Sequence, residues 1–157
     1  MEVLREAFPD YTILTEERGE LAGEGEARWI VNPLDGATNC AHELPIFTVS
    51  VALEKAGEVT VGAVYSPMAA EIYAAERGGG VTLNGQRIEV SDTDELIQAL
   101  LASSFSSDRE DIFATLDLSG KFADRMQGVR QLGTSTLDLC YVAAGRLDGC
   151  YERGFSA

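Results

Sequence analysis

The sequence predicts a layered α/β fold of the α+β type, in which a mixed, largely antiparallel sheet is flanked by helices. Residues 47–53 and 59–65 alternate apolar and polar side chains around a short turn, which is typical of a β-hairpin. Residues 108–118 and 134–144 carry apolar side chains at helical spacing. The chain has 157 residues, 45% of them hydrophobic, so we expect a single domain that spans residues 1–157.

The first half of the chain reads as strands and tight turns. An apolar run at residues 28–31 predicts a strand, and Pro33 is expected to end its hydrogen-bond ladder and open a loop. After the hairpin, residues 71–75 predict a further strand. Glycines at residues 78–80 and the Asn-Gly pair at residues 84–85 predict the turns of another hairpin.

The second half predicts a mixed sheet with helices. Residues 91–95 are expected to cap a short helix ahead of the apolar residues 100–102. A strand-sized segment at residues 129–132 separates the two longer helices. Gly145 ends the second of these helices, and residues 149–152 predict a closing strand.

The charge balance excludes several classes of partner. Twenty-six acidic against twelve basic residues give a formal net charge of −14, which disfavours nucleic acid and anionic membrane surfaces. No apolar stretch approaches the roughly 20 residues that cross a bilayer, and the first residues lack the order of a signal peptide. We therefore expect a soluble, cytoplasmic protein.

Lysine is rare among the basic residues. Lys55 and Lys121 are the two lysines, and an acid-rich, lysine-poor surface is typical of a protein kept soluble in concentrated salt. A halophilic source is one hypothesis from this composition, and an ordinary acidic protein is the other.

Cysteine and histidine offer little support for a metal site of nitrogen and sulfur ligands. Cys40, Cys140 and Cys150 form no Cys-x-x-Cys pair, so neither a zinc ribbon nor a disulfide framework is indicated, and buried thiols are expected. His42 is the single histidine. Metal or phosphate chemistry in this chain would therefore depend on oxygen ligands.

Oxygen-bearing side chains gather in three segments: Glu16-Glu17, residues 32–38, and residues 133–135 followed by Glu152. In the middle segment a strand leads through a glycine turn into a helix start. This arrangement presents backbone N–H groups where a phosphate can dock, with Asp35 close enough to hold a cation against it. Taken alone, Glu16-Glu17 has a solvated turn as its alternative, and Asp35-Gly36 has a simple turn.

Residues 29–39, which read W-I-V-N-P-L-D-G-A-T-N, resemble the signature W-I-V-D-P-I-D-G-T-T-N of the inositol monophosphatase family. The upstream residues 14–17 resemble the family's glutamate pair, and residues 133–152 resemble its later helix and strand. In order and spacing the likeness covers nearly the whole chain. It implies a fragment of the family's sugar phosphatase fold and a Mg²⁺-dependent phosphomonoesterase acting on a sugar or inositol phosphate.

The resemblance also implies roles for individual residues. Glu16 and Asp35 are implied as catalytic residues that bind Mg²⁺, and the backbone carbonyl of Leu34 as a further ligand. Asn32 stands where the family has another aspartate ligand. The residues implied to bind substrate are Gly36, Ala37 and Thr38 for the phosphate, and Ser135 and Glu152 for a sugar hydroxyl.

Two positions depart from the family signature, and both bear on activity. Asn32 offers one carbonyl oxygen but no charge to offset the repulsion between two dications. Ala37 replaces a threonine that in the family orients the attacking water, so a hydroxyl is lost. We also expect the domain to be truncated at both ends, because the family's outer aspartates have no counterpart here.

Two functions from different classes follow from these observations. The first is a Mg²⁺-dependent phosphomonoesterase of the inositol monophosphatase or fructose-1,6-bisphosphatase type, impaired by these departures. The second is a non-catalytic member that binds phosphate or metal, or pairs with an intact homologue. Because an incomplete fold leaves an apolar sheet face exposed, we expect a homodimer.

The charge composition predicts that stability depends on salt. Screening the repulsion among carboxylates should raise the thermal unfolding midpoint by about 5 °C or more between dilute buffer and molar potassium chloride. Circular dichroism in the two solutions measures the shift. An unchanged midpoint would rule out the halophilic hypothesis.

Overall fold

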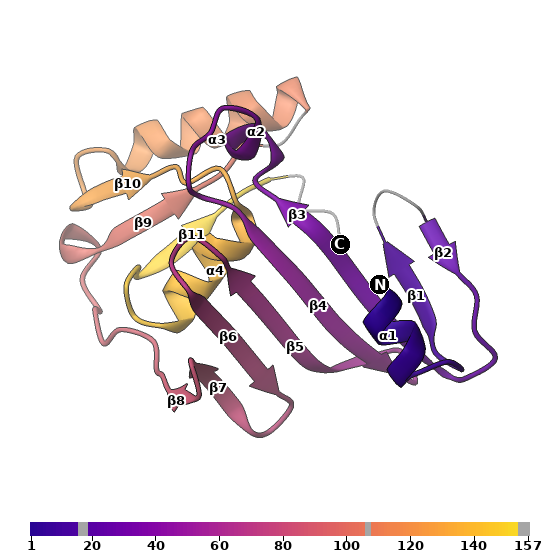
Figure 1. Ribbon diagram of the computed structural model, residues 1–157. Coiled ribbons are helices and arrows are strands. Elements are labelled where there is room, and N and C mark those ends of the chain that lie inside the picture. The colour runs from indigo at the N-terminus through magenta and orange to yellow at the C-terminus, as the bar shows by residue number, and fades with distance from the viewer. Residues whose placement is uncertain (16–18, 106–107, 154–157) are drawn as a thin grey trace. The chain divides into compact units, whose positions relative to one another are not determined.

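The computed structural model describes residues 1–15, 19–105 and 108–153, which fold into two compact units (Figure 1). The first unit contains Met1–Asp35 and Thr48–Arg87, and the second contains Gly36–Phe47 and the chain from Ile88 onward. The single domain expected from the chain length stays a prediction.

The first unit is an eight-stranded sheet in the order β2-β1-β3-β4-β5-β6-β7-β8. All neighbouring strands are antiparallel except β1 and β3, which confirms the predicted mixed, largely antiparallel sheet. A short helix, α1 (Glu2–Ala7), precedes it. The strands are β1 (Thr12–Thr15), β2 (Gly19–Leu21), β3 (Ala27–Asp35), β4 (Thr48–Lys55), β5 (Glu58–Ser66), β6 (Glu71–Glu76), β7 (Gly80–Leu83) and β8 (Gln86–Arg87).

Two tight turns explain the register of this sheet. Ala56 and Gly57 join β4 to β5 with φ values of 51° and 78°, and Asn84 and Gly85 join β7 to β8 with 49° and 78°. Two consecutive residues with positive φ form a type I′ turn, whose twist matches that of the flanking strands. The predicted hairpins are therefore confirmed.

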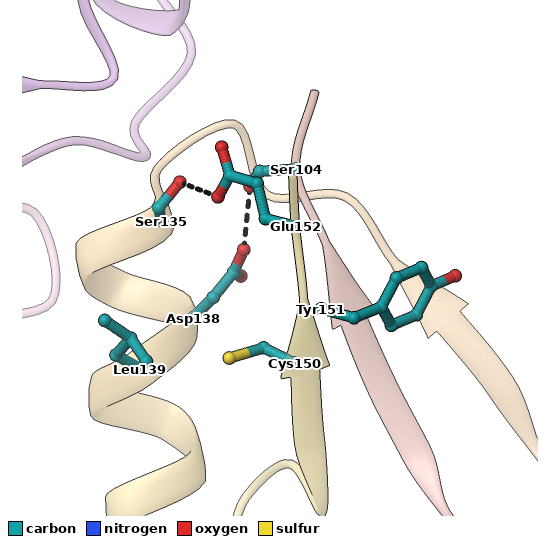
Figure 2. A pocket seen from close by; sticks show the side chains of 7 residues that line it. All are labelled: Ser104, Ser135, Asp138, Leu139, Cys150, Tyr151 and Glu152. Atoms are coloured by element: carbon teal, nitrogen blue, oxygen red, sulfur yellow. Dashed lines mark hydrogen bonds between the residues drawn. The ribbon is translucent and has the colours of Figure 1, made fainter. Parts of the chain in front are cut away.

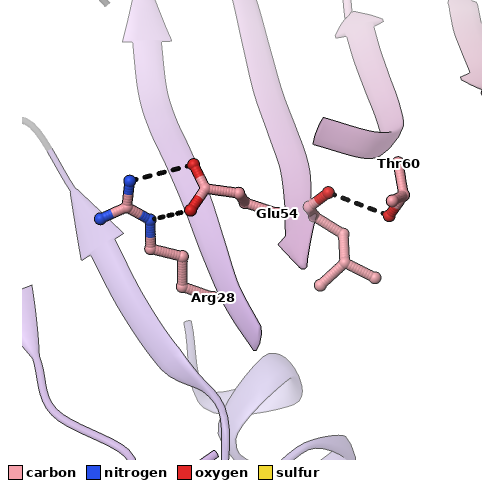
Figure 3. A network of polar contacts seen from close by, with 4 residues as sticks. Arg28, Glu54 and Thr60 are labelled. Carbon is pink, nitrogen blue, oxygen red and sulfur yellow. Dashed lines mark hydrogen bonds and ion pairs between the residues drawn. The ribbon is translucent and has the colours of Figure 1, made fainter. Parts of the chain in front are cut away.

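Two polar contacts reinforce the sheet where β4 pairs with its neighbours (Figure 3). Arg28 on β3 faces Glu54 on β4, and its Nε and Nη2 atoms lie 2.8 and 3.0 Å from the two carboxylate oxygens. Thr60 lies at a register shift between β4 and β5, and its hydroxyl donates to the Leu53 carbonyl at 3.2 Å. The ion pair is partly exposed, so screening by solvent limits its contribution to stability.

The prediction that Pro33 ends its strand is wrong. Strand β3 continues to Asp35, which pairs with Thr48 after a register shift that begins at Asn32. Proline donates no hydrogen bond, and an irregular stretch of ladder is where a strand tolerates it. The strand thus carries Leu34 and Asp35 to its own end rather than into a loop.

The second unit is built on a three-stranded sheet in the order β10-β9-β11. All its pairs are parallel, so the mixed sheet predicted for this half is wrong. Parallel strands need crossover connections, which α3 and α4 supply here. The elements are α2 (Ala37–Ala41), a 3₁₀ turn η1 (Leu96–Gln98), β9 (Leu100–Ser103), α3 (Arg109–Phe122), β10 (Gly128–Arg130), α4 (Ser135–Ala143) and β11 (Gly149–Tyr151).

Helices α3 and α4 begin at side-chain caps. The Asp108 carboxylate accepts from the Glu110 and Asp111 amides at 2.8 and 3.3 Å, and the Thr134 hydroxyl accepts from the Leu137 amide at 3.4 Å. Both helices are confirmed. The helix expected after residues 91–95 is replaced by the single turn η1, whose cap position Glu95 makes no side-chain cap hydrogen bond.

The two helices pack on opposite faces of β11. Tyr151 points toward α3, where its hydroxyl lies 2.7 Å from Ser119 Oγ and its ring packs edge-on against Phe122. Glu152 points toward α4 and accepts a hydrogen bond from Ser135. The alternation of side chains along an extended strand explains this division.

The cysteines differ from the expectation of buried thiols. Cys140 is buried in α4, but Cys40 and Cys150 are exposed. Cys40 lies in the short helix α2, and Cys150 lies on β11 at the edge of the three-stranded sheet. In the described part of the chain, no helix is long and apolar enough to span a membrane.

An apolar patch is exposed on the first unit, as expected. Val61, Tyr65 and Ile72 have exposed fractions of 37%, 44% and 46%, and the pairing of Tyr65 with Ile72 puts them on one face of β5 and β6. The self-association expected from such a patch stays a prediction.

Asp148, which directly precedes β11, connects this strand to the start of β9. Its carboxylate accepts from the Leu100 amide at 2.6 Å, and its own amide donates to the Leu100 carbonyl at 2.9 Å. Together with hydrogen bonds from Thr93 and Ser91, the Leu100 amide lowers the pKa of the carboxyl group. Since the folded pKa is below the unfolded one, this stabilisation is present above the unfolded value and is lost as the pH falls through the folded value.

We therefore expect Asp148→Asn to lower the free energy of unfolding by about 1 kcal/mol at pH 7, because the charge-assisted hydrogen bonds become neutral. The difference in the free energy of unfolding between parent and variant should become smaller as the pH falls below about 4. Urea denaturation across this pH range measures it, with the exposed Asp124→Asn as control. A difference that does not shrink at all as the pH falls below about 4 would contradict the assignment.

Candidate active site

The end of β3 carries the residues expected to bind metal. The Asn32 side-chain oxygen accepts a hydrogen bond from the Leu34 amide at 3.1 Å, which shapes the irregular stretch around Pro33. Leu34 and Asp35 follow, and both are half-buried. The amide oxygen of Asn32 is therefore already used by the backbone through one of its two lone pairs.

Gly36 turns the chain from β3 into α2. Its φ is +90°, and a Cβ atom at this position would lie 2.9 Å from the Ile46 carbonyl oxygen and 3.2 Å from the Phe47 Cα. Both the backbone conformation and the close approach require glycine. Helix α2 starts at the next residue, and Ala37 and Thr38 are exposed.

Ser135 and Glu152 meet in a pocket of the second unit with a volume of about 280 Å³ (Figure 2). The Ser135 hydroxyl donates to Glu152 Oε2 at 2.6 Å, and the Ser104 hydroxyl donates to Asp138 Oδ2 at 3.0 Å. The lining residues are Ser104, Ser135, Asp138, Leu139, Cys150, Tyr151 and Glu152. The pocket thus offers two carboxylates, each held by a serine hydroxyl.

The carboxylates give this pocket a negative potential. Cys150 is exposed as a residue, but partial burial of its thiol raises the pKa of that thiol, and the charges of Asp138 and Glu152 raise it further. Asp138 is 2% exposed, so its charge acts in a poorly hydrated environment. The thiol therefore stays protonated at neutral pH, and a neutral donor of hydrogen bonds fits this pocket better than an anion.

Magnesium prefers oxygen ligands in a near-octahedral arrangement. Asn32, Leu34 and Asp35 supply donors of that kind. Glu16 and Glu17 lie outside the described residues. Among residues 1–15, 19–105 and 108–153, no three His, Cys, Asp or Glu side chains gather as a metal site. The described donors are oxygen atoms, which magnesium prefers, but they supply too little negative charge to match the ion.

The predicted residues thus fall into two groups. Leu34 and Asp35 lie at the end of β3 directly before Gly36, and Ser135 and Glu152 form the hydrogen-bonded pair of the pocket. Sequence reasoning missed two pocket residues, Ser104 and Asp138. Asp138 could have been recognised from the sequence, because it is a lone carboxylate within a largely apolar helix.

Comparisons with known proteins point to one family. The model of the inositol monophosphatase family matches residues 1–157. The chain is 42% identical to an inositol-1-monophosphatase of Mesorhizobium japonicum, over 98% of this chain and 59% of that protein. It is 40% identical to the Nus factor SuhB of Escherichia coli, over 98% of this chain and 58% of that protein.

Solved structures with similar names also superpose on this chain. The inositol monophosphatase from Anabaena superposes with a TM-score of 0.91 at 41% identity, over 99% of this chain and 62% of that one. A structure described as an inositol monophosphatase–fructose 1,6 bisphosphatase superposes with a TM-score of 0.81 at 26% identity, over 98% and 56%. The chain spans less than two thirds of the length of these proteins.

We expect Asn32→Asp to strengthen magnesium binding on the order of tenfold or more, judging from the losses that follow removal of groups that support metal sites. A carboxylate can keep the hydrogen bond from the Leu34 amide with one oxygen and offer the other to a cation. Calorimetric titration with magnesium chloride, in salt that keeps both forms folded, measures the change.

The matched control is Asn84→Asp, which adds the same charge to a turn four strands away in the same sheet. Tighter binding in both variants would indicate a general effect of charge. Equal affinity in the parent and Asn32→Asp would mean that this strand end holds no metal.

Proposed function

Because the chain belongs to the inositol monophosphatase family, we propose that it carries the substrate site of a Mg²⁺-dependent phosphomonoesterase whose catalytic activity is reduced. The observation that carries this proposal is the hydrogen-bonded pair Ser135 and Glu152 in a pocket with a second carboxylate, Asp138. Carboxylate oxygens accept hydrogen bonds from the hydroxyl groups of a sugar or cyclitol.

The pocket favours a monophosphate of a neutral polyol over a bisphosphate. Two carboxylates line it, and none of the lining residues in the described chain is basic. A second phosphate placed there would meet like charges without a compensating cation. An inositol monophosphate therefore suits this site better than fructose 1,6-bisphosphate.

The phosphate is proposed to bind at Gly36, Ala37 and Thr38, where a helix start presents backbone amides that have no partner within the helix. Glu16, Asp35 and the Leu34 carbonyl are proposed to hold magnesium. A magnesium ion held by these donors would supply positive charge that polarises the phosphate and activates water. Glu152 orients the polyol, and Ser135 orients Glu152.

Two residues support the reduced activity. Ala37 has no hydroxyl with which to orient an attacking water. Asn32 brings no negative charge, and its oxygen already accepts from the Leu34 amide. The same observations favour the alternative function, a non-catalytic member that binds a phosphorylated polyol.

Further parts of the proposal concern the cellular setting. We propose a cytoplasmic, salt-adapted protein that self-associates as a homodimer. The exposed patch of Val61, Tyr65 and Ile72 supports the self-association, and the net charge of −14 supports the salt adaptation.

We expect phosphate release from myo-inositol 1-phosphate to be on the order of 100-fold or more slower than that of an intact relative, because one positioned hydroxyl is missing. The double variant Asn32→Asp/Ala37→Thr should raise the rate. Released phosphate is measured with and without magnesium. Turnover equal to that of the Anabaena enzyme would contradict the reduced activity.

The same assay tests the preference for a monophosphate. Myo-inositol 1-phosphate should bind at least about tenfold more tightly than fructose 1,6-bisphosphate. Glu152→Gln should narrow this difference, since it removes a like charge but keeps an acceptor. Tighter binding of the bisphosphate to the parent chain would overturn the proposed substrate class.

A further inference from the structure

Asn39 in α2 joins three segments of the second unit. Its side-chain amide nitrogen donates to the Ile46 carbonyl at 2.9 Å and to the Leu132 carbonyl at 2.7 Å. A primary amide has two hydrogens to donate, so both are used. The second of these hydrogen bonds spans 93 positions of the sequence.

The turn before α4 packs directly against this amide. Gly133 has a φ of +75°, and a Cβ atom there would lie 2.9 Å from Asn39 Nδ2 and 3.0 Å from Oδ1. Its two successors are the cap residue Thr134, which is fully buried, and Ser135, which holds Glu152. The Asn39 side chain thus lies against the backbone that starts α4.

We infer that Asn39 is a positioning residue that fixes the segment of residues 36–38 relative to Ser135 at the start of α4. This inference rests on the proposed function, in which the segment binds phosphate and the pocket binds the polyol. Asn39 itself touches no substrate and acts through the carbonyl groups of Ile46 and Leu132.

The consequence concerns ligands that use both ends of the site. A ligand that contacts the phosphate segment and the pocket together gains affinity from their fixed separation. If one end of the site becomes mobile, a ligand that contacts both ends loses this gain in affinity. A ligand that contacts only one end keeps its own contacts. Substitution of a residue that contributes only to stability would not change the affinities for these two kinds of ligand by different amounts.

The test compares three probes by calorimetry or NMR titration: inorganic phosphate, myo-inositol and myo-inositol 1-phosphate. In Asn39→Ala, the affinity for myo-inositol 1-phosphate should fall on the order of tenfold, and that for each half less than about threefold. Asn39→Asp, which places a carboxylate against two carbonyl oxygens, should show the same split. Gly133→Ala adds a Cβ atom that crowds the Asn39 side chain, so it should lower the affinities in the same pattern.

Asn84→Ala is the matched control, because the Asn84 side chain also connects two backbone groups, Ile72 and Ala70, but lies in the first unit. It should lower stability and leave the affinities for all three probes unchanged. Equal weakening of the three probes in Asn39→Ala, or no weakening at all, would overturn the inference.

Hydrogen exchange separates failure of this inference from failure of the proposed function. If the parent chain binds none of the probes, the proposed function is wrong, and exchange decides the inference alone. Amide exchange in Asn39→Ala should then rise together in residues 36–47 and 132–137. A rise confined to one of these segments would show that Asn39 does not couple them.

Discussion

The passage from β3 into α2 depends on the close approach of Gly36 to the backbone of Ile46. At a φ of +90°, Gly36 lies where a Cβ atom would come within 2.9 Å of the Ile46 carbonyl oxygen. The same carbonyl accepts a hydrogen bond from Asn39. One backbone group therefore sets both the turn that follows Asp35 and the orientation of the helix that follows the turn.

In the pocket, serine hydroxyl groups stabilise two carboxyl groups that are at least partly removed from solvent. Burying a carboxylate costs free energy unless hydrogen bonds compensate it. Ser104 donates to Asp138, and Ser135 donates to Glu152. A carboxylate can accept more than one hydrogen bond, so one serine hydroxyl does not saturate it.

At the end of β3, the Asn32 side chain shapes the backbone without supplying charge. The amide oxygen of Asn32 accepts a hydrogen bond from the Leu34 amide, and a carboxylate oxygen in its place would accept a stronger, charge-assisted one. An amide at this position therefore keeps the hydrogen bond but supplies no negative charge.

The sequence by itself determined the features that depend on neighbouring residues. The Asn84-Gly85 turn and the signature at residues 29–39 are local signals, since each depends on residues that are close together in the sequence. Alternation and helical spacing likewise predicted β4, β5, α3 and α4 close to their observed bounds.

The tertiary structure decided whatever depends on a distant partner. Strand β3 continues past Pro33 because β4 pairs with it again at Asp35. Asp138 faces Ser104, and Asn39 reaches Leu132, because packing brings together segments that are far apart in the chain. No local pattern encodes such contacts, since they form only when loop closure places both partners against a common core.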